Sequence, residues 1–500
     1  GVDIGLGSMA NPGNGGGIHL SGTTNATIVN SSITSNVAAW EGGGLWNNLG
    51  TMVVDNTLVD SNDAQGTITS TGGGGIFNNG GTLTVQNATT VTNNLANNNL
   101  GSGGGIFSTD GTVTVNSSWV SYNTSHRAGG GIELIDGNLI MVNTTLDFNT
   151  TTTSPGNGGG LHISGSADAS ILGGTVNNNI AASEGGGLWN GSGAMTVSGV
   201  IIDGNEAQGN NADNGGAGIF NNGGTLNVQA STIITNNSAT GTSGSGGGIF
   251  STNGAVTIDA AEITLNTSNR AGGGIELIEG ALNITNSVVD ENSTGASPGN
   301  GGGFHITGAA NATITGGTFN NNVASREGGG LWNGSGIMTV DGTTINGNIA
   351  SGDTADDGGA GIFNNGGTLI VQNNTTISNN VADGTAGSGG GVLSIGGDIT
   401  FNNVSIITNQ ANRAGGGIEL AGGTLTLVNT TLDNNNAGVA PAVAAPGSGG
   451  GLHVTGSAST TITGGTTNGN IAANEGGGLW NGSGIMTIVA HTVDANIVSG

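Results

Sequence analysis

One repeated position of the chain holds side chains that could bind or react. In five successive repeats it is occupied by His19, Trp46, Phe77, Phe107 and Glu133, and the order then recurs with Leu393 at one Phe position. Strict alternation places this position on the outer face of a strand. Neighbouring exposed aromatics mark interfaces, which predicts a stripe that packs on a second copy or stacks on sugar rings. The stripe comprises Trp46, Phe77, Phe107, Trp189, Phe220, Phe250, Trp332, Phe363 and Trp480.

A plainer interpretation of this column is also open. The side chains could only stiffen the sheet through contacts between neighbouring strands. The His residues recur every five repeats, roughly 24 Å apart at strand spacing, so neighbouring copies cannot share a metal ion. We therefore expect each His to be a solvated surface residue.

Acidic side chains gather in the longer loops at Asp213, Asp353, Asp356 and Asp357. Clustered carboxylates suit Ca²⁺, which takes many oxygen ligands, so these four residues are candidate calcium ligands. Their positions shift between repeats and no calcium-repeat pattern is present, which favours solvated acidic loops as the alternative. No other cofactor is predicted.

Catalysis is the main competing class of function. Glycoside hydrolysis needs two positioned carboxylates, and Asp356–Asp357 is the only pair of adjacent Asp residues. The chain has no Lys. An active site should interrupt the repeat, and the spacing of the repeats is interrupted only by the apolar insertion Val439–Ala445. We predict no catalytic residues and no enzyme. Ice binding by the Thr pairs Thr82/Thr84 and Thr112/Thr114 is a weaker alternative, because the repeats on either side of these two lack a matching Thr pair.

Composition excludes several classes of protein. The 500 residues include 106 Gly and no Cys, and 31 acids against 4 bases give a net charge of −27. Four Arg cannot form the basic face that a nucleic acid requires, and no apolar run is long enough to span a bilayer. The absence of Cys excludes a disulfide scaffold and is compatible with an extracellular location. The acidic charge keeps a long chain soluble.

The elements that position these residues come from an internal repeat. Gly-Gly-Gly or Gly-Ala-Gly followed by an apolar residue occurs 17 times at spacings of 26 to 34 residues, and five repeats form a super-repeat of 143 residues. The predicted segments are 1–154, 155–297, 298–445 and a partial fourth, 446–500, all within one continuous solenoid. The chain begins and ends within this pattern, so we expect it to be part of a longer protein.

A second column pairs an apolar residue with Asn three positions later. We predict that its Asn residues are structural, because Asn tolerates the left-handed region and stacked amides can bond one another. The column comprises Asn36, Asn62, Asn94, Asn123, Asn149, Asn179, Asn205, Asn237, Asn266, Asn292, Asn322, Asn348, Asn380, Asn409, Asn435, Asn470 and Asn496.

Between these columns the apolar residues alternate, as in Leu83-Thr-Val85, and each repeat therefore holds about three short strands. One repeat cannot bury its own apolar face, but stacked repeats can. The sequence thus predicts an all-β parallel solenoid of about 17 coils, a rod of roughly 80 Å at strand spacing.

The paired motifs Gly-Gly-Gly-Ile and apolar-x-x-Asn resemble the repeats of chlamydial polymorphic outer-membrane proteins. More broadly they resemble right-handed parallel β-helix repeats of the pectate-lyase-like superfamily, including bacterial surface proteins. The resemblance implies a right-handed β-helix that is secreted or attached to a cell surface. We therefore expect a non-enzymatic extracellular structural rod or adhesin, a segment of a giant surface or filament protein that self-associates laterally. Cell-surface glycans are candidate partners, and a polysaccharide-binding or polysaccharide-cleaving β-helix is the alternative.

Overall fold

The computed structural model describes residues 13–153, 155–295, 298–438 and 446–500. These residues fold as an all-β parallel solenoid of about 16 turns without helices, which confirms the predicted fold class and is close to the predicted number of coils. The chain divides into two compact units, Gly1–Val256 and Thr257–Gly500. The described part of the chain has no helix with the length and hydropathy needed to cross a lipid bilayer.

The coil that starts at Gly42 shows how one repeat folds. Its strands are β5 (Leu45–Asn47), β6 (Thr51–Asp55), β7 (Leu58–Asp60) and β8 (Asp63–Ala64). The sequence predicts about three strands in each repeat, and the structure adds the two-residue strand that follows the Asn of the second column. Apolar side chains alternate toward the interior, so Leu45, Met52, Val54 and Val59 are fully buried in the core.

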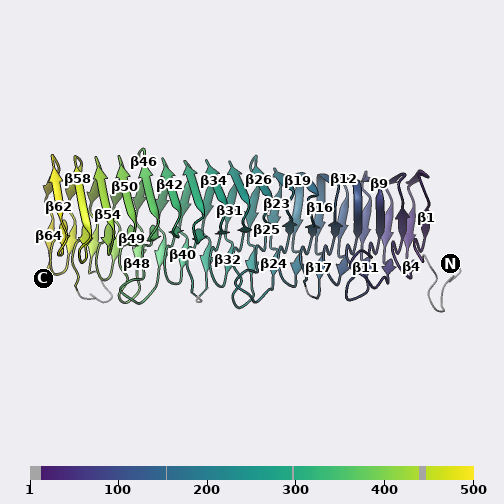
Figure 1. Cartoon of the computed structure of the whole chain (residues 1–500), viewed down its shortest axis with the longest axis horizontal. Coiled ribbons are helices and arrows are strands. Elements are labelled where there is room, and N and C mark those ends of the chain that lie inside the picture. The colour runs from purple at the N-terminus through teal and green to yellow at the C-terminus, as the bar shows by residue number, and fades with distance from the viewer. Residues whose placement is uncertain (1–12, 154, 296–297, 439–445) are drawn as a thin grey trace. The chain divides into compact units, whose positions relative to one another are not determined.

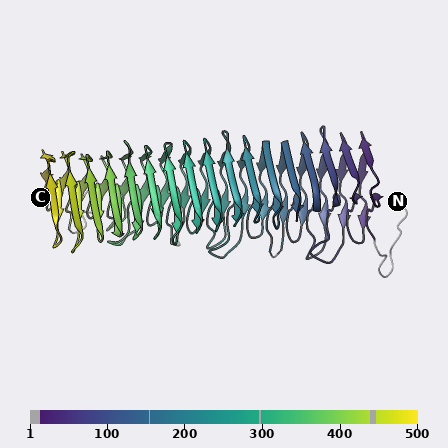
Figure 2. The ribbon, with the colours of Figure 1, turned by 45° about the horizontal axis from the view of Figure 1, so that its top comes forward.

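Each strand pairs in parallel with its equivalents in the neighbouring coils. β5 pairs with β1 (Ile18–Leu20) and with β9 (Ile76–Gln86), and the residues of the three strands are in register. The short strand β8 pairs with β4 (Val37–Ala38) and β11 (Leu95–Ala96) in a separate sheet. Figures 1 and 2 show this row of short strands beside the longer ones, with the connecting loops projecting from the same side.

The first strand of each coil carries the aromatic, His and Glu column. In the first unit these strands continue with β12 (Ile106–Asn116), β15 (Ile132–Leu134), β18 (Leu161–Ile163), β21 (Leu188–Asn190), β25 (Ile219–Asn222) and β29 (Ile249–Thr252). In the second unit they are β33 (Ile275–Ile278), β37 (Phe304–Thr307), β41 (Leu331–Asn333), β45 (Ile362–Asn365), β49 (Val392–Gly396), β53 (Ile418–Leu420), β57 (Leu452–Val454) and β61 (Leu479–Asn481).

The glycine triplet lets two backbone segments of one coil touch. Gly42 has a φ of 65°, a left-handed conformation that glycine adopts without steric cost. A Cβ atom on Gly43 would collide with the carbonyl oxygen of Gly74 and would lie 2.6 Å from the backbone nitrogen of Asp63. The triplet therefore brings the start of the first strand directly against the short strand of the same coil.

The chain turns sharply before the short strand, and the prediction tied the left-handed backbone there to the column Asn. In the structure the residue before that Asn is the left-handed one. Ser61 and Asn93 have φ values of 56° and 52°, whereas Asn62 and Asn94, which follow them, have none in the left-handed region. The Asn column is thus selected for its side-chain hydrogen bonds, and the residue before it makes the turn.

Several sequence predictions fall on residues outside the described ranges. The Val439–Ala445 insertion lies wholly outside them, and so do residues at the predicted segment boundaries near 154, 297 and 445. The boundary between the two compact units, at Val256, falls inside the predicted segment 155–297.

Candidate functional site

The predicted interaction column is continuous within each unit because the first strands pair in register. In the first unit it runs His19, Trp46, Phe77, Phe107, Glu133, His162, Trp189, Phe220 and Phe250. In the second unit it runs Glu276, His305, Trp332, Phe363, Leu393, Glu419, His453 and Trp480.

Neighbouring rings of the column are in contact. The His162 and Trp189 rings stack with centroids 4.1 Å apart, and Phe220 and Phe250 meet edge to face at 5.1 Å. These are the favoured geometries of aromatic pairs.

The structure buries this column, so the expectation of an exposed stripe is wrong. Eight of the nine stripe residues are at most 7% exposed: Trp46, Phe77, Phe107, Trp189, Phe220, Phe250, Trp332 and Phe363. Trp480, in the last described coil, is half-buried. The ring contacts fit the alternative interpretation, a column that stiffens the sheet.

The outer face of the first strand is covered by the segment that leads into each glycine triplet. Glu41 ends one such segment, and its Oε2 atom accepts a hydrogen bond of 3.0 Å from Trp46 Nε1. Backbone bridges join the equivalent segments of neighbouring coils, as between Gly72 and Ser102 and between Ser102 and Ala128. A parallel strand that is packed on both faces is buried at every position. The alternation of apolar and other residues distinguishes the two faces of the strand, but it does not show that the outer face is packed as well.

The expectation of solvated histidines is also wrong for the interior coils. His162 is buried, and its Nδ1 atom lies 2.8 Å from Oε2 of Glu133, which is 0% exposed. The other carboxylate oxygen, Oε1, accepts a hydrogen bond of 3.0 Å from Ser164 Oγ and lies 3.6 Å from Arg127 Nη1. These contacts place the imidazole, the guanidinium and the hydroxyl around one buried carboxylate.

The same cluster occurs twice in the second unit. His305 Nδ1 lies 2.8 Å from Glu276 Oε2, and His453 Nδ1 lies 2.7 Å from Glu419 Oε2. A Thr hydroxyl replaces Ser164: Thr307 donates to Glu276 at 2.8 Å, and Thr455 donates to Glu419 at 2.7 Å. Each cluster again has its Arg, with Arg413 Nη1 3.7 Å from Glu419 Oε1.

A carboxylate that orients His Nδ1 is half of a catalytic triad in chemical terms. General acid–base catalysis also requires the imidazole to reach a substrate proton, and these side chains are closed off from solvent. The arrangement instead satisfies buried charges with one another, which is the condition for placing them in a protein interior.

A second set of carboxylates caps the Trp residues. Glu184 Oε2 accepts from Trp189 Nε1 at 3.1 Å, and its Oε1 accepts from Asn214 Nδ2 at 2.8 Å. Burial raises the pKa of Glu184, and the hydrogen bond from Trp189 partly offsets that rise. Burial likewise raises the pKa of Glu327, which accepts from Trp332 at 3.0 Å.

The four candidate calcium ligands do not come together. Asp213 is exposed in the first unit, and Asp353 and Asp356 are exposed in the second. Asp357 is buried, and its Oδ1 lies 2.7 Å from Arg326 Nε while Oδ2 accepts from Thr354 N at 2.9 Å. Among the described residues, no group of three or more acidic, His or Cys side chains could hold a metal ion. The geometry favours the alternative of solvated acidic loops for the three exposed Asp residues, and a guanidinium already neutralises the buried carboxylate of Asp357.

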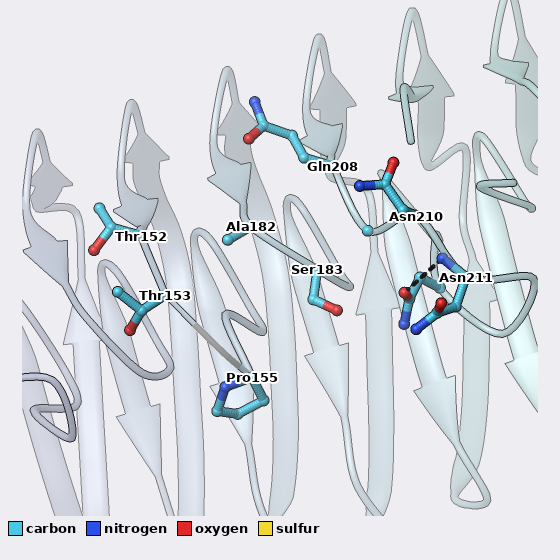
Figure 3. A pocket seen from close by; sticks show the side chains of 10 residues that line it. Thr152, Thr153, Pro155, Ala182, Ser183, Gln208, Asn210 and Asn211 are labelled. Atoms are coloured by element: carbon cyan, nitrogen blue, oxygen red, sulfur yellow. Dashed lines mark hydrogen bonds between the residues drawn. The ribbon is translucent and has the colours of Figure 1, made fainter. Parts of the chain in front are cut away.

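A shallow groove of about 360 Å³ lies among the connecting segments of the first unit. Thr152, Thr153, Ser183, Gln208 and Asn210 line it, and Figure 3 shows their side chains around its opening. Its lining consists of hydroxyls, amides and small apolar groups, without a carboxylate or imidazole that could act as an acid or base.

The Asn column forms an amide ladder in each unit. Asn94 Nδ2 donates to Asn123 Oδ1 at 3.0 Å, and the same oxygen accepts the backbone N–H of Asn94 at 3.0 Å. Asn94 Nδ2 also donates to the carbonyl of Val59 at 3.0 Å. The amide therefore ties three successive coils together.

Sequence reasoning missed a second, shorter ladder on the first strands. Asn47 Nδ2 donates to Asn78 Oδ1 at 2.7 Å, and Asn78 Nδ2 donates to Ser108 Oγ at 3.0 Å. It also missed the Glu–His pairs. A signal for these pairs was present, because Glu133 and His162 occupy the same repeat position in consecutive coils.

Comparison of the chain with protein-family models, curated proteins and solved structures gives no match.

Proposed function

We propose that this chain is a non-enzymatic extracellular solenoid that serves as a structural rod or an adhesin. The observation that carries the proposal is where the reactive side chains lie. The Glu133–His162 pair and its two copies in the second unit are buried and bonded between coils, where they hold the fold and reach no substrate.

Composition and motif resemblance support the location. The net charge of −27 and the absence of Cys suit a soluble extracellular chain, and the paired Gly-Gly-Gly and Asn motifs resemble those of surface β-helix proteins. Lateral self-association remains part of the proposal. It must use loops or exposed strand faces, because the predicted aromatic stripe is buried.

Incubation of the purified chain with neutral and acidic polysaccharides tests the absence of catalysis. We expect neither reducing ends nor unsaturated ends above the level of a heat-denatured sample. Release of either product by the folded chain, abolished in an Asp356→Asn/Asp357→Asn variant, would replace this proposal with polysaccharide cleavage.

Negative-stain imaging of the native material separates the two structural roles. Laterally bundled particles support a filament or sheath component, and single stalks projecting from a surface support an adhesin. Soluble particles found only inside cells would overturn both.

A further inference from the structure

Three exposed aromatic side chains lie at one corner of the first unit. Tyr122 and Phe148 are 55% and 44% exposed, and their rings stack with centroids 4.9 Å apart and planes 4° from parallel. Trp119, at the start of β13 (Trp119–Ser121), is 45% exposed. We call these three residues the aromatic ridge.

Two of the three ridge residues stand at backbone positions that disfavour large side chains. Tyr122 and Phe148 directly precede ladder residues Asn123 and Asn149, and their φ values are 57° and 56°. In the neighbouring coils of this unit the same corner is occupied by Ser, Asn or Gly, which suit the left-handed region. Bulky residues held in this region are outliers that concentrate at functional sites.

The ridge also breaks the super-repeat. One period of 143 residues later, the positions of Trp119, Tyr122 and Phe148 hold Glu262, Leu265 and Glu291, and two periods later they hold Ser405, Thr408 and Asn434. The fold therefore does not need aromatics here. Tyr122 is the only Tyr of the chain.

The amide side chains on either side of the ring pair lean away from it. Asn93, in the coil before Tyr122, donates from Nδ2 to Asp60 Oδ1 at 2.9 Å, one coil further away. Asn178, in the coil after Phe148, places Oδ1 2.8 Å from where a Cβ of Gly204 would lie, again one coil further away. Much of the surface of both rings is consequently left to solvent.

Hydroxyl and carboxylate groups flank the ridge. In the register of β13 with β16 (Asn138–Asp147), Trp119 lies beside Thr145, and Ser121 lies beside Asp147. Asp147 Oδ1 accepts from the backbone N–H of Asn177 at 3.1 Å, and Oδ2 makes no hydrogen bond within the described residues. These groups supply donors and an acceptor next to the apolar rings.

We infer that the aromatic ridge binds an uncharged glycan, laying the C–H face of a pyranose ring on the aromatic surface while sugar hydroxyls bond to Asp147, Ser121 and Thr145. The negative ring faces attract polarised C–H groups. This inference rests on the adhesive form of the proposed function and names its ligand class.

Charge selects this occupant over others. In the first unit the outward column that holds Ser121 and Asp147 also holds Asp60 and Asp203, and it contains no basic residue. An acidic polysaccharide or a nucleic acid would be repelled, and a second copy would bring another 27 negative charges. An uncharged sugar chain escapes this repulsion and uses the hydroxyls and carboxylate at the ridge.

Calorimetric titration of the whole chain with cellohexaose, chitohexaose and hexagalacturonate tests the inference. We expect binding of at least one of the two uncharged probes and none of hexagalacturonate. The triple variant Trp119→Ser/Tyr122→Thr/Phe148→Asn should weaken that binding by about tenfold or more. Its replacements are those the fold already carries at Ser405, Thr408 and Asn434, and unfolding curves will check that it folds. Leu265→Thr, at the equivalent corner of the second unit, is the matched control and should bind as the parent chain does.

Three outcomes would overturn the glycan assignment: no binding of either uncharged probe, binding of hexagalacturonate alone, or full affinity in the triple variant. Sedimentation of the same samples identifies the other occupant, because self-association lost in the triple variant would assign the ridge to a second copy. A reducing-end assay on the titrated mixtures keeps the two proposals apart. Cleavage would overturn the non-enzymatic function, whereas absent binding without cleavage would overturn only the ridge.

Discussion

The Nδ1 atom of His162 lies 2.8 Å from Oε2 of Glu133 in the preceding coil, and both side chains are buried. The pair forms only when these two coils are neighbours in the correct order. A slip of the stack by one coil would place the carboxylate against an aromatic ring and leave a buried charge unpaired. We interpret the Glu–His pairs as devices that specify coil order, a role known for buried polar groups elsewhere.

A double-mutant cycle tests this interpretation. Glu133→Leu and His162→Phe should each destabilise the chain by about 3–5 kcal/mol, because each leaves its partner buried and unpaired. The double variant, which carries residues like those elsewhere in the column, should cost less than the sum of the two. Urea unfolding monitored by circular dichroism measures the effects, and additive losses would contradict the coupling.

Removal of one amide from the ladder should open the structure locally. Asn123→Ala leaves the backbone N–H and the Nδ2 of Asn94 without the oxygen they share, at a cost of about 2–5 kcal/mol. Hydrogen exchange should accelerate in the adjacent strands, including β13 and β16. Asn99→Ala, in an exposed loop, is the control and should stay within about 0.5 kcal/mol. Equal protection in the two variants would show that the ladder is dispensable.

Mild acidification should stabilise the chain. Burial raises the pKa of Glu41, and the hydrogen bond from Trp46 lowers it in part. The folded carboxyl then binds a proton more tightly than the unfolded one, so its contribution is fully present below the unfolded pKa and is lost as pH rises through the folded pKa. Burial also raises the pKa of Glu184, Asp147 and Asp290. We expect the Tm to rise as the pH falls from 7 to about 5.

Glu41→Gln isolates one contribution to that pH dependence. The amide oxygen can still accept from Trp46 Nε1 and from Asn14 Nδ2, which both bond Oε2 of the parent carboxylate. Ionisation is removed, so the Tm should change less between pH 7 and 5 than in the parent chain. An opposite influence enters at lower pH, because hydrogen bonds from Thr385 lower the pKa of Asp353, and that stability is lost as the carboxylate protonates. A Tm that falls steadily from pH 7 to 5 would disprove the expectation.

The middle glycine of a triplet should resist substitution where two backbones touch. Gly104→Ala should destabilise the chain by about 3 kcal/mol, because the added Cβ atom would collide with the carbonyl oxygen of Gly130. At the same position of another coil, Ala217 is already accommodated, so Ala217→Gly should cost only about 1 kcal/mol. Similar unfolding midpoints for the two variants would contradict the steric explanation.

The repeat makes much of the architecture predictable from the amino-acid sequence. Alternation at Leu83 and Val85 identifies inward residues, and the regular recurrence of Asn94 and Asn123 places them in one column whose amides meet. Such predictions succeed because a solenoid turns short-range periodicity into long-range contact: residues at equal positions in successive repeats become neighbours.

The burial of Trp46 and His162 depended on tertiary structure. Period-two alternation correctly places them opposite Leu45 and Leu161, but the side of a strand is a local property, whereas burial depends on what else packs there. The segment before each glycine triplet covers that second side, and its path is set by contacts between coils. The same packing left the stacked rings of Tyr122 and Phe148 exposed. Strand positions, coil count and the Asn column were therefore determined by the sequence alone, while which of the aromatic side chains meet solvent was decided only when the coils closed over one another.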